Sequence, residues 1–207
     1  YGQKQKTERD HIYFGTVLEH ILLQNLCAFY DVGEHNEMRL HGADWNDALD
    51  MAWEKGESVA FTCAYAGNLR NIAKTLRQLE EISGSSKIEI AHEMEDLLAG
   101  SEELYEDAAR KQALLAGYAK KCEHNISGDT IVVRLDQLAA NLEGKADWMM
   151  KNIRANEWVK DGEDGWFNGY YDNHGRKVEG VMDESVRMML TGQVFAIMSG
   201  TATEDQV

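Results

Sequence analysis

The residues best suited to chemistry lie together in the stretch Asp44-Trp45-Asn46-Asp47. An indole offers a flat apolar face to a sugar ring, and its N–H can donate a hydrogen bond. A carboxyl group held against such a wall can have its pKa raised, so that it can act as a general acid. Trp45 and Asp47 are two residues apart, so a turn or extended segment can place them on one side. This spacing suits a carbohydrate site.

The same residues also fit a structural interpretation. Aspartate is a favoured helix N-cap, so Asp44 and Asp47 could cap the helical sequence that follows. Trp45 could equally belong to the core. A second aromatic region, between residues 161 and 180, contains Trp166 and Tyr171 and is rich in glycine. It reads as a loop that borders a sugar site or packs into the core.

The remaining sequence predicts the elements that position these two regions. Thr16 and Glu19 have the spacing of a capping box, and apolar residues at helical spacing follow them. That helix should end near Asp31. The segment 34–47 reads as a loop, and Ser86 with Glu89 forms a second capping-box candidate. Further helices are predicted after residues 56–58, over 87–98 and over 102–122. Another helix should begin near residue 130, be interrupted at Gly144 and continue over 146–158. A final helix is predicted over 193–199.

This order of elements predicts an all-α fold. Long helices with short breaks would stack as antiparallel pairs, which places the two aromatic and polar loops at the same end. No composition shift divides the chain, so residues 1–207 are expected to form one unit. The sequence starts without Met and contains no proline, which we interpret as a helical fragment of a longer protein.

Composition excludes several classes of partner. The formal net charge is -15, from Lys+Arg 21 against Asp+Glu 36. A nucleic-acid groove needs a basic surface, and an anionic membrane would repel this one. Cys27, Cys63 and Cys122 form no metal-binding or disulfide pattern, so free thiols in a reducing, cytoplasmic compartment are expected. No cofactor or metal is indicated.

Residues 42–48, Gly-Ala-Asp-Trp-Asn-Asp-Ala, resemble the Asp-Trp-Asn-Asp motif of glycoside hydrolase family 94, the cellobiose and chitobiose phosphorylases. Other segments resemble the family in the same order: 16–20, 56–59, 164–172 and 193–200. The resemblance implies part of an (α/α)6 barrel, a six-hairpin toroid that is incomplete here. It also implies a dimer of the full-length protein.

The resemblance further implies a reaction. Members carry out inverting phosphorolysis of a β-linked glucoside, a disaccharide or oligosaccharide, to an α-sugar 1-phosphate. Inorganic phosphate is the co-substrate and nucleophile, and its binding residues are expected largely outside this chain. Asp47 then takes the role of the general acid. Substrate-binding roles fall on Trp45, Asp44, Trp166, Tyr171 and Gln193.

Departures from the family and two rival functions stay open. Ala43 and Ala48 stand where family members usually carry glycine, and Asp172-Asn173 stands where aspartate pairs are common. These changes leave the acceptor sugar undefined. An inverting hydrolase would instead need a second carboxylate about 6.5–9.5 Å from the acid to activate water, and Glu57 or Asp172 could supply it. The other rival is a non-catalytic helical scaffold or carbohydrate-binding module.

Overall fold

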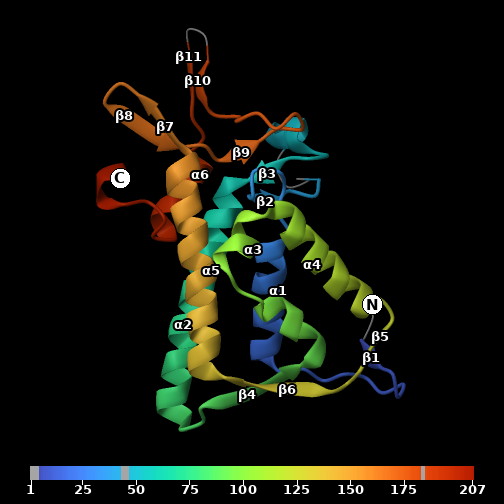
Figure 1. Cartoon of the computed structure of the whole chain (residues 1–207). Helices are drawn as coiled ribbons and strands as arrows, with labels where there is room; N and C mark the ends of the chain where they lie inside the picture. The colour runs from blue at the N-terminus through green and yellow to red at the C-terminus, as the bar shows by residue number, and fades with distance from the viewer. Residues whose placement is uncertain (1–4, 43–46, 183–184) are drawn as a thin grey trace.

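The computed structural model describes residues 5–42, 47–182 and 185–207, without the side chains of 47–49. Two long helices, α2 (Val59–Ser83) and α5 (Leu135–Asn156), pack side by side and run in opposite directions (Figure 1). The ion pairs Arg70–Asp147 and Arg77–Glu143 join their exposed faces. Gly144 lies within α5, so the predicted break in this helix was wrong.

Helix α1 (Val17–Tyr30) forms where the apolar spacing predicts a helix, and it lies beside α2 and α5. The Thr16 hydroxyl accepts a hydrogen bond from the Glu19 N–H, which confirms the predicted N-cap. The Glu19 carboxylate does not close the capping box. It accepts instead from the Tyr13 hydroxyl at 2.8 Å and from the Ala91 N–H at 3.0 Å. A local capping residue is therefore used for a tertiary contact.

The predicted helix over 87–98 is a strand followed by a 3-10 helix. Strand β4 (Lys87–Ala91) pairs antiparallel with β6 (Thr130–Arg134), and η2 (His92–Leu98) follows β4. The physical reason is visible in the side chains. Ile88 and Ile90 alternate with charged residues, and β6 is rich in β-branched residues that favour an extended backbone.

Shorter elements occupy the middle and the lower right of the molecule in Figure 1. The predicted helix over 102–122 is divided into α3 (Glu102–Glu106) and α4 (Ala108–Lys121). The division falls at Asp107, whose side chain caps α4 by accepting from the Arg110 N–H. Parallel strands β1 (Lys6–Thr7) and β5 (Asn125–Ile126) lie beyond α4.

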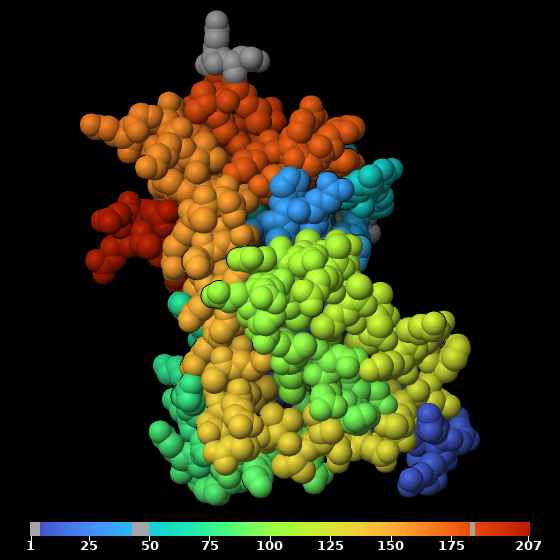
Figure 2. Space-filling view, viewed as in Figure 1, coloured from blue at the N-terminus to red at the C-terminus, as the bar shows by residue number. Residues whose placement is uncertain are grey.

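The opposite end carries most of the short strands. In Figure 2, the orange segments that follow α5 gather at this end, away from the blue N-terminal segment. The predicted final helix over 193–199 is confirmed as α6 (Leu190–Met198). The predicted loop over 161–180 instead contains short strands, and further short elements flank it. The elements besides α6 are β7 (Trp158–Asp161), β8 (Asp164–Phe167), β9 (Tyr170–Tyr171), β10 (Gly180–Met182), β11 (Ser185–Arg187) and η3 (Glu204–Gln206).

The prediction of an all-α fold was therefore wrong. Of the described residues, 53% are helical and 19% lie in strands, which form five small sheets. All of the described strands have two to five residues, so they produce little periodic signal in the hydrophobic pattern of the sequence. Their pairing is set by where the long helices bring distant segments together.

Two lysines are buried in the core between α1, α4 and α5. The Lys111 ammonium lies 4.2 Å from the centre of the Phe29 ring, and the Lys145 ammonium lies 5.4 Å from it. Burial lowers the pKa of each lysine to about 7. Lys111 also donates to the Asn36 carboxamide oxygen at 2.8 Å, so the core supports the loop before β2 (Met38–Arg39).

Candidate functional site

Strand β3 (Glu57–Ser58) joins the two regions that the sequence singles out. It pairs antiparallel with β2 on one side and with β9 on the other, where Glu57 faces Tyr171. The 3-10 helix η1 (Asp47–Ala52) lies between β2 and β3 in the chain. The structure thus brings the segment after the Asp-Trp-Asn-Asp stretch against the aromatic region 161–180.

One residue, Asn173, holds these two regions together. Its carboxamide oxygen accepts from the N–H groups of Glu54 and Lys55, both at 2.8 Å. Its backbone N–H donates to the Met51 carbonyl, also at 2.8 Å. Residues 51–55 are therefore fixed to the loop after β9 by three hydrogen bonds.

Three of the predicted site residues fall at the edge of what the structure describes. Asp44 and Trp45 lie outside the described residues. Asp47 is the first residue of η1, and its side chain is not described. The acid role of Asp47 and the sugar-platform role of Trp45 stay predictions. A nearby indole that the sequence analysis missed, Trp53, directly follows η1 and is 50% exposed.

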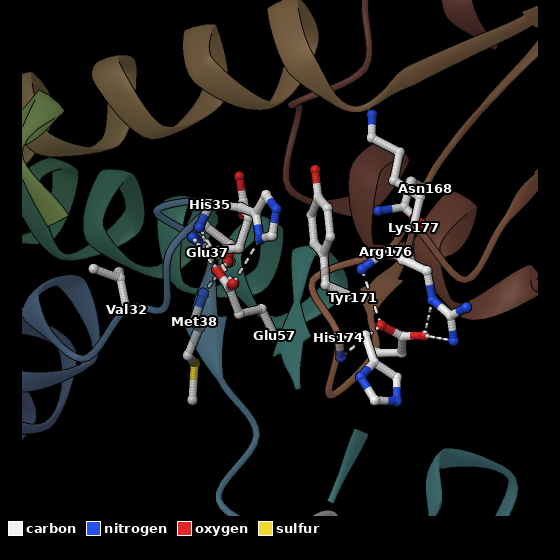
Figure 3. Close-up of polar contacts among 12 residues, drawn as sticks. Val32, His35, Glu37, Met38, Glu57, Asn168, Tyr171, His174, Arg176 and Lys177 are labelled. Carbon is white, nitrogen blue, oxygen red and sulfur yellow. Dashed lines mark hydrogen bonds and ion pairs between the residues drawn. The ribbon is translucent and has the colours of Figure 1, made fainter. Parts of the chain in front are cut away.

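The buried Glu57 carboxylate pairs with the half-buried imidazole of His35. Its carboxylate accepts from the His35 Nδ1 at 2.8 Å and from the His35 and Glu37 N–H groups at 3.1 Å. The His35 ring stacks on Tyr171, with ring centres 3.7 Å apart and planes 10° apart (Figure 3). The sequence analysis missed His35, because its partner is 22 residues away and no local motif marks it.

Tyr171 connects this pair to a second buried carboxylate, Glu157. The Tyr171 hydroxyl donates to Glu157 at 2.7 Å, and the Asn168 carboxamide donates to the other oxygen at 3.0 Å. Lys177 lies 3.4 Å from Glu157. Burial raises the pKa of Tyr171, and the Glu157 charge raises it further, so this hydroxyl stays protonated.

A third carboxyl group, on Glu37, is fully buried. One oxygen accepts from the Asn152 carboxamide at 3.2 Å, and the other has no partner among the described residues. Burial raises the pKa of Glu37 well above its usual value, and the charges of Glu157 and Glu57 add to this. The Glu37 carboxyl group therefore keeps its proton to a higher pH than an exposed glutamate does, mainly because it is buried.

Asp172 is held by the turn that follows β9. One oxygen accepts from the N–H groups of His174 and Arg176 at 2.9 Å, and the other pairs with the Arg176 guanidinium at 2.8 Å. Burial alone would raise the pKa of Asp172, but the bonds from Arg176 and His174 outweigh it and lower the pKa. The carboxylate therefore stays ionised.

Trp166 and Gln193, two predicted substrate-binding residues, lie in β8 and α6. The Trp166 side chain is buried. Gln193 accepts from the Phe167 N–H at 2.8 Å and donates to the Phe167 carbonyl at 2.7 Å, so it joins α6 to β8. These contacts position the strand that leads to β9. Substrate contact by either residue stays a prediction.

A polar hollow of about 570 Å³ opens beside the His35–Glu57 pair. Its walls come from both regions that Asn173 joins. Lys55 and His174 also line it, and both are exposed. A hollow with carboxylate, imidazole, ammonium and amide groups suits a hydroxyl-rich ligand better than an apolar one.

Two features that the described residues lack bear on the chemistry. Across 5–42, 47–182 and 185–207, no three His, Cys, Asp or Glu side chains are grouped so that they could hold a metal ion. Within the same ranges, no helix has both the length and the apolar character needed to cross a bilayer.

Comparison with known proteins gives one informative match. No family model matches the chain. The sequence is 26% identical over 190 residues to the solabiose phosphorylase of Paenibacillus borealis, a match that covers 91% of this chain. The chain spans 17% of that protein's length. The similarity extends across both candidate regions and supports a distant relationship to a phosphorylase.

Proposed function

We propose that this chain is the part of a sugar phosphorylase that carries its general acid. In this proposal, Asp47 protonates the glycosidic oxygen of a β-linked gluco-disaccharide or oligosaccharide. Inorganic phosphate attacks the opposite face of the sugar and forms an α-sugar 1-phosphate. The observation that carries the proposal is the 26% identity to solabiose phosphorylase over 91% of the chain.

The chemistry needs only one carboxyl group from this segment. A glycosidic oxygen leaves poorly as an alkoxide, so a positioned acid accelerates cleavage by about 10²–10⁴-fold. Phosphate is already an anionic nucleophile and needs no base to activate it. Cations or N–H donors must hold it, and we place these largely outside the 207 residues.

The hydrogen bonds of Glu57 and Asp172, the two carboxylates that a hydrolase could use as its base, favour phosphorolysis over hydrolysis. Glu57 accepts hydrogen bonds from His35 and from the Glu37 N–H. Asp172 accepts from His174 and pairs with Arg176. A carboxylate whose oxygens are occupied in this way is poorly placed to bind and deprotonate water. The enzyme proposal therefore does not require a second catalytic carboxylate here.

The test is an end-point assay on the protein that carries these residues. The protein is incubated with β-linked glucobioses, with and without inorganic phosphate, and ³¹P NMR follows the α-sugar 1-phosphate. We expect the product only when phosphate is present. Release of free sugar at the same rate without phosphate would support a hydrolase and contradict the proposal.

The acid is tested by Asp47→Asn, which keeps the shape of the side chain and removes its proton. Turnover should fall by about 10²–10⁴-fold. Asp50→Asn is the matched control, because Asp50 lies on the same 3-10 helix and is exposed. Equal effects of the two substitutions, or an unchanged rate in Asp47→Asn, would refute the assignment.

A further inference from the structure

One ring nitrogen of His35 is available to a ligand in the polar hollow beside β3. The Nδ1 atom bonds to the Glu57 carboxylate at 2.8 Å, which fixes that end of the imidazole. Among the described residues, no group hydrogen-bonds to the other nitrogen, Nε2, and this atom is not buried. The His35 side chain is 30% exposed and lines the hollow, so a ligand can reach Nε2.

The His35 ring is held from several sides. The Tyr171 ring stacks on one face, with ring centres 3.7 Å apart. Gly175 lies against the outer edge, where an added Cβ would be 3.2 Å from Cε1 and 3.8 Å from Nε2. Gly175 also lines the hollow, so this edge of the ring forms part of its wall. In Figure 3 the His35 ring lies beside Tyr171 and above the Glu57 carboxylate. A ring fixed in this way loses little freedom when a ligand binds.

The loop that carries His35 is anchored to the core. The next residue, Asn36, has a left-handed φ of 67°. Its carboxamide donates to the Tyr105 carbonyl and accepts from the Lys111 ammonium group, both at 2.8 Å. The His35 N–H itself donates to Glu57 at 3.1 Å. The backbone is therefore fixed on both sides of the imidazole before any ligand arrives.

The charges around the hollow favour a neutral polar ligand over an anion. Glu34 and Glu54 line it together with Lys55. Arg39 also lines it, but its guanidinium is paired with Asp31. Phosphate would be repelled by the two carboxylates, whereas a neutral hydroxyl group can donate to Nε2 of a neutral imidazole.

We propose that His35 Nε2 accepts a hydrogen bond from a hydroxyl group of the departing sugar, the one that leaves when Asp47 protonates the glycosidic oxygen. This inference rests on the proposed function. Glu54 and Lys55 follow η1, which begins with Asp47, so the hollow adjoins the segment that carries the proposed acid. The other sugar has to face phosphate, whose ligands we place largely outside the 207 residues. His35 is thus a specificity residue and takes no part in bond cleavage.

The first test measures binding without turnover. D-glucose and inorganic phosphate are titrated separately into the purified protein, and ¹H–¹³C NMR of the histidine Hε1 signals reports binding. The His35 signal is identified by its absence in His35→Asn. We expect glucose to shift this signal and phosphate to leave it unchanged. A shift with phosphate, or no shift with glucose, would overturn the proposal.

The second test removes the outer nitrogen. His35→Asn keeps an N–H for Glu57, because the asparagine amide takes the place of Nδ1, and has no acceptor at the position of Nε2. The assay runs in the direction of synthesis, with α-glucose 1-phosphate as donor and glucose as acceptor. The KM for glucose should rise by about three- to tenfold, the size of one neutral hydrogen bond, while kcat stays within about twofold.

His92→Asn is the matched control for this assay, because His92 is exposed and directly follows β4, far from β3 in Figure 1. Circular dichroism confirms folding of both variants. An unchanged KM for glucose in folded His35→Asn, or an equal rise in the KM for α-glucose 1-phosphate, would refute the assignment.

The two tests separate this inference from the proposed function. If glucose binds at His35 but no α-sugar 1-phosphate forms, the phosphorylase proposal fails and the sugar site stands. If phosphorolysis proceeds while glucose leaves the His35 signal unchanged, the proposed function stands and this inference fails.

Discussion

The buried lysine Lys111 gives a prediction whose size follows from the structure. Its pKa is about 7 in the folded chain and 10.5 for an unburied lysine. Between these values the unfolded chain binds a proton that the folded chain does not, so stability rises as the pH rises. Each pH unit in this window contributes about 1.4 kcal/mol. From pH 7.5 to 9, Lys111 should therefore add about 2 kcal/mol to the free energy of unfolding.

The perturbation is Lys111→Met, which keeps an apolar stem of similar length without an ionisable group. The variant should lose about 1–3 kcal/mol at every pH, because the Asn36 oxygen loses its donor. More decisively, its stability should gain about 2 kcal/mol less than the wild type between pH 7.5 and 9. The thiols also titrate near this window, but they are common to both proteins and cancel in the comparison.

The opposing effect is the attraction of the ammonium ion to the Phe29 and Trp148 rings, at 4.2 and 4.8 Å. Desolvated contacts of this kind can favour the charged lysine by about 2 kcal/mol. The wild type would then gain less than about 1 kcal/mol more stability than Lys111→Met between pH 7.5 and 9. Urea unfolding of both proteins at pH 7.5, 8, 8.5 and 9 measures this difference. Lys120→Met, at an exposed position on the same helix, is the control. Parallel curves for the wild type and Lys111→Met would refute the reasoning.

Two further predictions concern the contacts around β3 and β9. Tyr171→Phe removes the hydroxyl that donates to the buried Glu157 carboxylate, so the free energy of unfolding in urea should fall by about 1.5–3 kcal/mol. A fall below about 0.5 kcal/mol, the size of a typical surface substitution, would contradict that hydrogen bond. Gly33→Ala would place a Cβ 2.2 Å from the Glu57 carboxyl carbon and should destabilise the chain by about 1–3 kcal/mol. Gly117→Ala is the control, because a Cβ there meets nothing within 4 Å; it should be neutral or stabilising by up to about 1 kcal/mol. If both alanine variants lost the same free energy of unfolding, the space beside Glu57 would not be tight.

The sequence predicts the helices better than the strands. The Thr16 cap and the apolar spacing after it predict α1. Ser58 caps α2, which begins directly after residues 56–58 as predicted. The strands β2, β3 and β9 have two residues each, which is too short for a periodic signal. For β4, the alternation of Ile88 and Ile90 was present in the sequence, but the capping-box spacing at Ser86 led to the helix interpretation.

The proximity of the two candidate regions was predictable from the sequence, but the contacts between them were not. Antiparallel helices place both aromatic regions at one end, and β3 and β9 indeed meet there. The pairing of His35 with Glu57 and the bonds of Asn173 depend on residues that lie far apart in sequence. Buried acids such as Glu37 are equally hard to predict, because a charged residue in a loop normally indicates exposure.

The three bonds of Asn173 bear on how a sugar would reach the site in the proposed function. Separating residues 51–55 from the loop after β9 would break all three bonds together. We therefore expect the proposed substrate to enter by a path that leaves this junction closed. In related sequences, replacement of Asn173 should be accompanied by changes in the length of the turn at 53–55, because that turn takes its shape from a single carboxamide.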